Sequence, residues 1–251
     1  MADDLFSVKG RIACVTGASS GLGRHAALML ARAGAHVVGV ARREDALRDW
    51  AAEVGEHAAY VVADVADRVT LPETVAAIRA PFGAPQIVLH AAGVNTRQSA
   101  DEVTPEGWDA TLALNLTAPF FLTQSLVPGM RAGGWGRVVN FASLQTTRAF
   151  PGGIAYGASK AGIAQLTRAM AEAWSRDGIT ANAIGPGFFP TELTQAVFGD
   201  AERAARNAAQ TCIGRNGDLS DMDGPLLFLC SEASRYVTGQ VLMVDGGFTA
   251  K

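Results

Sequence analysis

Short apolar runs alternate along the chain with longer segments in which apolar positions recur at helical spacing. The short runs are rich in Val, Ile and Ala and do not alternate with polar residues, which is typical of strands covered on both faces. The expected strands are residues 12–16, 36–40, 59–63, 87–91, 137–141, 180–184 and 241–244. Helical periodicity is clearest over residues 23–33, 69–80, 155–175 and 221–230. The pattern predicts a doubly wound α/β fold, a parallel sheet of about seven strands with helices on both faces.

No linker divides this alternation, so the sequence predicts one domain spanning residues 1–251, of which 49% are hydrophobic and 18% charged. The segment 188–213 breaks the rhythm and carries Phe188, Phe189, Pro190 and Phe198. An irregular, aromatic-bearing insertion after a strand predicts a lid over a substrate site. A plain pair of surface helices is the alternative.

Charge and cysteine usage narrow the class of protein. The formal net charge is −3 and the 21 basic residues are scattered, which argues against a nucleic-acid partner. Cys14, Cys212 and Cys230 lie far apart without a CxxC pair, so we expect a reducing compartment and no metal site. Residues 1–9 contain no apolar run, and the uncharged stretch 110–130 is interrupted by polar residues and prolines. The sequence therefore predicts a cytoplasmic protein without a membrane partner.

The first expected strand runs directly into a glycine-rich turn, Gly17-Ala18-Ser19-Ser20-Gly21-Leu22-Gly23, where a helix begins. Glycines allow a tight turn and the close backbone approach that a pyrophosphate requires, and a helix N-terminus supplies N–H donors. Glycines alone can serve only as a turn. Their position between a first strand and a first helix favours phosphate binding. The predicted contacts are Gly17, Ser19, Ser20, Gly21, Leu22 and Gly23.

The sequence TGASSGLG at 16–23 resembles the cofactor turn of the short-chain dehydrogenases/reductases. The resemblance continues to about residue 248, through YGASK at 156–160, NAIGPG at 182–187, TGQ at 238–240 and VDGG at 244–247. It implies a Rossmann-type oxidoreductase that interconverts a secondary alcohol and a ketone by hydride transfer, with a tyrosine as the acid/base.

Tyr156 and Lys160 are four residues apart, so on a helix they share one face. A nearby ammonium favours the phenolate and would prepare Tyr156 for proton exchange. Taken alone, such a pair also fits a solvated helix face. The resemblance implies that Ser143 hydrogen-bonds the substrate oxygen and that Lys160 also holds the nicotinamide ribose.

Asn115 completes the catalytic tetrad that the resemblance implies. Pro119, four residues later, lacks an N–H and crowds the carbonyl of Asn115 in a helix. The freed carbonyl could hold a water that links Lys160 to solvent. An ordinary helix kink is the alternative reading of the proline.

The end of the second expected strand bears on the choice of cofactor. NAD-preferring members tend to have an acid there, whereas this chain has Ala41 followed by Arg42 and Arg43. An acid repels a 2′-phosphate and arginine binds it, so we expect NADP(H), with Arg42 and Arg43 at the phosphate. Alternatively, the pair starts a solvated helix with Glu44 and Asp45.

The resemblance implies further cofactor contacts around the sheet. Asp64 and Val65 would border the adenine, although Asp64 could serve only as a helix cap. HAAG at 90–93 replaces the usual NNAG, which leaves fewer side-chain hydrogen bonds and predicts lower local stability. The remaining predicted contacts are Ala91, Ala92 and Gly93 on the adenosine side, and Pro186, Gly187 and Thr191 at the carboxamide.

The segments that indicate the substrate are less specific than the cofactor and catalytic motifs. The segments DLFS at 4–7, LQ at 144–145 and DGGFTA at 245–250, together with Arg97, resemble gluconate 5-dehydrogenases, whereas 3-oxoacyl-carrier-protein reductases share most other motifs. Candidate substrate contacts are Arg97, Gln145, Arg148 and Phe188, with solvated loop residues as the alternative. A non-catalytic NADP-sensing scaffold would be expected to lose Tyr156 or Lys160. Dehydratases and epimerases of the longer branch usually carry a larger C-terminal domain.

Apolar residues recur at helical spacing after Lys160, at Ile163, Leu166, Met170 and Trp174. Family members commonly use this helix in a two-fold interface, so the sequence predicts a homotetramer. Core packing within one subunit is the alternative.

Overall fold

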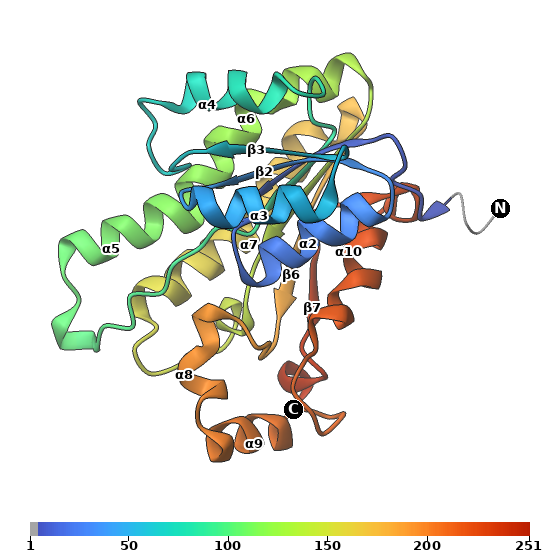
Figure 1. The fold of residues 1–251 in the computed structure, drawn as a ribbon. Coiled ribbons are helices and arrows are strands. Elements are labelled where there is room, and N and C mark those ends of the chain that lie inside the picture. Colours follow the sequence, from blue (N-terminus) through green and yellow to red (C-terminus); the bar gives the residue numbers. More distant parts are fainter. Residues whose placement is uncertain (1–4) are drawn as a thin grey trace.

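The apolar runs form seven parallel strands in the computed structural model, which describes residues 5–251 (Figure 1). Their bounds differ from the predicted ones by at most two residues. Asp4 of the DLFS segment lies outside the described residues. The strands are β1 (Ile12–Thr16), β2 (His36–Ala41), β3 (Ala58–Val62), β4 (Ile87–His90), β5 (Gly136–Phe141), β6 (Ile179–Pro186) and β7 (Val241–Val244).

The order across the sheet is β3-β2-β1-β4-β5-β6-β7, which confirms the predicted doubly wound α/β fold. The helices between the strands are α2 (Gly21–Arg32), α3 (Glu44–Val54), α4 (Leu71–Arg79), α5 (Pro105–Leu112), α6 (Ala118–Ala132), α7 (Ile154–Trp174), α8 (Gln195–Phe198), α9 (Ala201–Gln210) and α10 (Asp223–Cys230). The chain reverses direction across the sheet between β1 and β4. Folds of this type bind their ligands at that switch point, beyond the carboxyl ends of the strands.

Successive residues of the central strands enter two different cores, because side chains in a strand alternate between faces. Ala13 and Val15 of β1 pack with α2, α3 and α10, whereas Cys14 packs with α4, α6 and α7. Both faces are therefore apolar, which explains why these strands read as continuous hydrophobic runs.

The predicted interface face of α7 lies in the core of the subunit. Ile163 and Met170 are fully buried, and Leu166 and Trp174 pack against the same apolar clusters. Core packing therefore accounts for Ile163 and Met170, whereas Leu166 and Trp174 are only partly buried. The use of this face in a subunit interface stays a prediction.

The uncharged stretch after residue 109 is also a core element. Residues Pro105–Ala132 are long and apolar enough to cross a membrane by length and composition alone. In the structure they divide into α5, a π-helical segment (Ala113–Thr117) and α6, which packs against α4 and β5. Leu122 and Leu126 are among its buried residues, as the sequence predicted.

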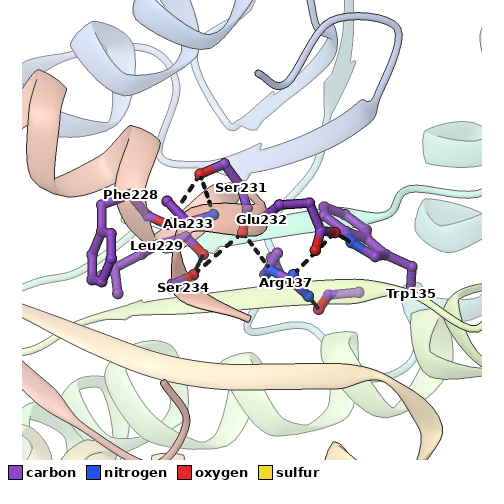
Figure 2. A network of polar contacts seen from close by, with 9 residues as sticks. Trp135, Arg137, Phe228, Leu229, Ser231, Glu232, Ala233 and Ser234 are labelled. Atoms are coloured by element: carbon purple, nitrogen blue, oxygen red, sulfur yellow. Dashed lines mark hydrogen bonds and ion pairs between the residues drawn. The ribbon is translucent and has the colours of Figure 1, made fainter. Parts of the chain in front are cut away.

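A network around Arg137 ties the start of β5 to the residues that follow α10 (Figure 2). The Arg137 Nε donates to the Ser231 carbonyl at 3.0 Å, and Nη2 lies 3.4 Å from a Glu232 carboxylate oxygen. The same Glu232 oxygen accepts from the Trp135 indole, whose ring lies 4.3 Å from the guanidinium. Because the buried charge has these partners, Arg137 anchors α10 against the sheet.

Candidate active site

The glycine-rich turn between β1 and α2 leaves no room for side chains at two of its glycines. Gly17 has φ +73°, and a Cβ there would lie 2.7 Å from the Ala92 backbone nitrogen. A Cβ on Gly23 would lie 2.4 Å from the Gly17 carbonyl oxygen. The backbone can therefore approach a ligand closely here, with the first N–H groups of α2 facing the turn. This cradle fits a dinucleotide pyrophosphate.

The strand end at β4 is held by residues that replace the missing asparagines. The Ala92 N–H donates to the Thr16 hydroxyl at 3.2 Å, which ties β4 to β1. His90 is buried, and its Nε2 lies 2.7 Å from the Thr123 hydroxyl on α6. Burial lowers the pKa of His90 to about 3, so the imidazole is neutral. The predicted loss of hydrogen bonding does not occur, because Thr16 and His90 make the ties instead.

Asn115 lies in the π-helical segment that precedes Pro119. The Ala118 N–H donates to the Ala113 carbonyl, five residues back, and Pro119 has no N–H to donate to a carbonyl of the preceding turn. The irregularity predicted from the proline is thus a π-bulge. It places the buried Asn115 side chain against the loop after β4, where it accepts from the Val94 N–H and donates to the Val94 carbonyl, both at 2.9 Å.

Asn115 and Lys160 converge on Gly93. A Cβ on Gly93 would lie 3.3 Å from Asn115 Oδ1 and 3.9 Å from Lys160 Nζ. Asn115 Nδ2 also donates to the Ser159 hydroxyl at 3.0 Å, which ties the π-segment to α7. Ser159 lies inside the YGASK motif, but its sequence position gave no sign of this contact.

Lys160 is buried, and its Nζ donates to the Phe141 carbonyl at 2.6 Å. Phe141 ends β5, two residues before Ser143, so this bond holds α7 against the strand end that carries the serine. Burial lowers the pKa of Lys160 to about 8. The amine is therefore poised to lose or gain its charge close to neutral pH.

A side-chain hydrogen bond from Ser143 acts on the pKa of Tyr156, so the two residues that the resemblance assigns to the substrate oxygen lie together. Burial raises the pKa of Tyr156, while the Ser143 hydrogen bond and the positive charge of Arg97 act in the opposite direction. The lysine was expected to lower this pKa. In the structure Lys160 instead points its ammonium at the Phe141 carbonyl, with Nζ 5.5 Å from the tyrosine ring centre.

The two arginines after β2 differ in their surroundings. Arg43 reaches the glycine-rich turn, where its Nε and Nη2 donate to the Ser19 hydroxyl at 3.3 and 3.2 Å. Arg42 is more exposed and lies 3.8 Å from the Asp64 carboxylate. Asp64 also accepts from the Ala66 N–H at 3.0 Å, so it caps the turn after β3 beside the buried Val65. Arg43 is thus the better placed of the two for a phosphate at the turn.

The strand end at β6 leads into the segment predicted to form a lid. Gly187 donates to the Val244 carbonyl at 2.9 Å, directly after Pro186, and a Cβ there would lie 2.8 Å from Asp245 Cα. Thr191 then lies over the glycine-rich turn, close to Gly21. The segment continues as a short 3₁₀ turn (Glu192–Thr194), α8 and α9, so it contains the helix pair that was weighed against a lid.

Arg97 lies in the loop after β4 and faces both Tyr156 and the lid segment. It has φ +54°, the one positive value outside glycine in residues 5–251. Its Nη2 donates to the Leu193 carbonyl at 2.6 Å. A strained backbone of this kind persists where surrounding contacts fix it, and often at functional sites.

The other substrate candidates divide into two groups. Gln145 packs its side-chain oxygen against the start of α7 at Gly153 and Gly157, close to Tyr156. Arg148 is exposed and donates to the Lys251 carbonyl at the C-terminus. The structure thus pairs Arg148 with the chain end.

Phe188 belongs to a cluster of three aromatic side chains, of which only Phe188 was predicted as a site residue. Its ring centre lies 6.3 Å from that of Phe150 and 5.7 Å from that of Phe248. The cluster joins the loop after β5, the lid segment and the C-terminus. These three segments are far apart in the sequence, so no local pattern could have indicated it.

Comparison with known proteins places this site in a family. The model of the family described as enoyl-(acyl carrier protein) reductase matches residues 17–249. Gluconate 5-dehydrogenase of Gluconobacter oxydans is 39% identical over 98% of this chain and 97% of its own length. A 3-oxoacyl-[acyl-carrier-protein] reductase of Vibrio cholerae is 32% identical over 96% of this chain and 98% of its own. The chain belongs to the short-chain dehydrogenase/reductase family.

A solved relative has nearly the same architecture. The crystal structure of a gluconate 5-dehydrogenase from Burkholderia cenocepacia, in complex with NADP and tartrate, covers 100% of both chains with a TM-score of 0.94 and 35% identity. The predictions of an oxidoreductase and of a resemblance to gluconate 5-dehydrogenases and 3-oxoacyl-carrier-protein reductases are confirmed. NADP in that relative agrees with the cofactor predicted from Ala41 and the arginine pair.

Proposed function

We propose that the protein is an NADP(H)-dependent dehydrogenase that interconverts a secondary hydroxyl and a ketone on a sugar acid. The observation that carries the substrate class is Arg97. Its guanidinium is close enough to Tyr156 to act on the tyrosine pKa, and the lid contact at Leu193 holds it there. A carboxylate bound by Arg97 would place a hydroxyl of the same molecule near Tyr156. Tartrate, bound in the Burkholderia cenocepacia relative, is itself a hydroxylated acid.

The reaction follows from the roles of the four side chains. When bound, NADP(H) supplies or accepts the hydride. Tyr156 donates its phenolic proton to the substrate oxygen in reduction and takes it back in oxidation. Ser143 orients that oxygen by a hydrogen bond, and its bond to the Tyr156 hydroxyl keeps the two groups together.

Lys160 and Asn115 support the same proton transfer indirectly. The Lys160 ammonium holds the nicotinamide ribose and favours the Tyr156 phenolate once it turns from the Phe141 carbonyl. The Asn115 carbonyl, released by the π-bulge, binds the water that connects Lys160 with solvent. The cofactor contacts are the glycine-rich turn, Arg42 and Arg43 at the 2′-phosphate, Asp64 and Val65 at the adenine, the 91–93 loop, and Pro186, Gly187 and Thr191 at the carboxamide.

A substrate comparison with a matched arginine control tests the proposal. The purified protein is assayed with NADP⁺ on D-gluconate, on neutral sorbitol and on a 3-hydroxyacyl thioester. We expect gluconate to have the highest kcat/KM. Arg97→Gln should lower kcat/KM for gluconate by roughly 10-fold or more, the effect of losing a charged hydrogen bond, and should change sorbitol turnover much less.

Arg148→Gln is the control, because Arg148 bonds to the C-terminus rather than facing Tyr156. It should change the two substrates equally. A higher kcat/KM on the acyl thioester would instead support the carrier-protein reductase, the function of the Vibrio cholerae relative. Equal losses on gluconate and sorbitol in Arg97→Gln would contradict the sugar-acid assignment.

The protein works as a single-domain, cytoplasmic homotetramer in this proposal, with residues 188–213 as the lid. Support for association comes from the sheet edge at β7, where Leu242 and the neighbouring Ile213 are exposed apolar side chains. Leu242 and Ile213 also line a pocket of about 360 Å³. Open strand edges and exposed apolar patches are typical of subunit contacts. Light scattering at working concentration should report about four times the 26.1 kDa subunit mass, and a monomer mass would contradict the tetramer.

A further inference from the structure

The guanidinium of Arg43 is paired with a carboxylate of its own chain. Its Nη1 and Nη2 each donate to one oxygen of the Glu192 carboxylate, both at 3.0 Å. Nη2 and Nε contact the Ser19 hydroxyl as well. Glu192 belongs to the lid segment, 149 residues further along the chain. The pair therefore joins the lid to the arginine expected at the 2′-phosphate.

The geometry of this pair is that of an anion on an arginine fork. A carboxylate and a phosphate both present two oxygens to the two outer nitrogens of a guanidinium. The hydrogen bond from Arg43 lowers the pKa of Glu192, and a weaker one from Ser20 acts in the same direction. Glu192 is therefore ionised at neutral pH. Both side chains are about half exposed, so a dissolved anion can reach Arg43 and displace the carboxylate.

Glu192 is held in place from both sides. Thr191 lies against Gly21 of the glycine-rich turn, and the carbonyl of Leu193 accepts from Arg97. A cleft of about 640 Å³ separates the start of α2 from this segment and is lined by both Ser20 and Glu192. The contacts of Thr191 and Leu193 therefore keep the Glu192 carboxylate beside the glycine-rich turn.

We propose that Glu192 is a specificity-determining residue that competes with the 2′-phosphate of NADP(H) for Arg43. The carboxylate occupies the arginine until the phosphate replaces it, and its negative charge opposes the phosphate but not a 2′-hydroxyl. Glu192 therefore reduces the preference for NADP(H) over NAD(H), and releases the lid from Arg43 when NADP(H) binds. The inference rests on the proposed use of NADP(H).

Equilibrium binding of two adenosine fragments tests this role without turnover. Calorimetry at low, fixed ionic strength compares adenosine 2′,5′-bisphosphate with 5′-AMP, because salt screens exposed charges. Glu192→Gln should lower the Kd of the bisphosphate by roughly 2- to 5-fold, the range of exposed ion pairs, and leave that of 5′-AMP unchanged. Glu202→Gln, an exposed glutamate of α9 paired with Arg206, removes the same charge and should change neither.

A second variant separates competition from a structural effect. In an Arg43→Gln background, Glu192→Gln should no longer tighten binding of the bisphosphate. An equal change for both fragments, or an effect that persists without Arg43, would overturn the competition. A wild type that binds the bisphosphate no more tightly than 5′-AMP would overturn the use of NADP(H) itself. A wild type with that preference and no response to Glu192→Gln would overturn only the role of Glu192.

Discussion

The ammonium of Lys160 donates to the carbonyl of Phe141 at 2.6 Å, so the end of β5 holds the second turn of the catalytic helix. This bond links the strand that ends two residues before Ser143 to the helix that carries Tyr156. It also gives the buried Lys160 ammonium a hydrogen-bond acceptor, because burying an unpaired charge costs free energy. The bond therefore fixes the position of Lys160 relative to the end of β5.

Lys160 is predicted to act in both catalysis and cofactor binding. Lys160→Met should lower kcat and weaken NADPH binding together, because the lysine serves both Tyr156 and the nicotinamide ribose in our account. Fluorescence titration of NADPH and steady-state rates measure the two effects on the same sample. A loss of kcat with unaltered NADPH affinity would contradict the ribose-holding role.

The same variant should reveal the cost of burying the charge. The pKa of Lys160 is about 8 in the native protein and about 10.5 in an unfolded chain, so between these values the unfolded state binds the extra proton. Wild-type stability relative to Lys160→Met should therefore rise with pH from 8 toward 10.5, by at most about 1.4 kcal/mol per pH unit. Denaturant unfolding of both proteins across this range measures the difference. A constant difference would show that Lys160 titrates normally.

His90 should make the fold sensitive to acid. Its pKa is about 3 in the native protein, whereas the unfolded chain takes up that proton near pH 6.5, so stability is lost as pH falls through 6.5 toward 3. At pH 5 this group should cost about 2 kcal/mol of unfolding free energy relative to neutral pH. His90→Asn, which introduces the residue usual in the family, should remove that part of the loss. Parallel acid dependence in the two proteins would contradict a neutral, buried imidazole.

The arginine pair should set cofactor selectivity, with Arg43 contributing more than Arg42. Arg43→Ala should lower the ratio of kcat/KM for NADP(H) over NAD(H) by roughly 10-fold or more, because bonds to charged phosphates are lost. Arg42→Ala should have a smaller effect, since its nearest charged partner is Asp64. Ala41→Asp should lower the ratio further by repelling the phosphate. A larger effect at Arg42, or equal losses with both cofactors, would contradict this arrangement.

The sheet could be predicted from the sequence because its central strands are buried on both faces. These strands therefore appear as largely apolar runs, and the bounds of all seven follow within two residues. The tetrad was implied by the family resemblance, and two local signals point to structural features at its residues: Tyr156 and Lys160 share one helix, and Pro119 marks the π-bulge at Asn115. These signals are local in the sequence.

What the sequence could not indicate depends on contacts between distant segments. The periodic face of α7 gave no sign of how much of it packs within its own subunit, where Ile163 and Met170 are buried. The bond of His90 to Thr123 and that of Arg43 to Glu192 join different elements, so neither has a spacing rule. Lys160 was expected to act on Tyr156 directly, but the Phe141 carbonyl competes for its ammonium.

The central claim is that Tyr156 exchanges the proton during NADP(H)-linked hydride transfer. Its most direct test is Tyr156→Phe, which removes only the hydroxyl, with kcat on the best substrate and the Kd of NADPH measured together. We predict that kcat falls by about 10²–10⁴-fold, the usual contribution of a general acid or base, while NADPH affinity is almost unchanged. A variant that keeps near-normal kcat on that substrate would show that Tyr156 is not the acid/base.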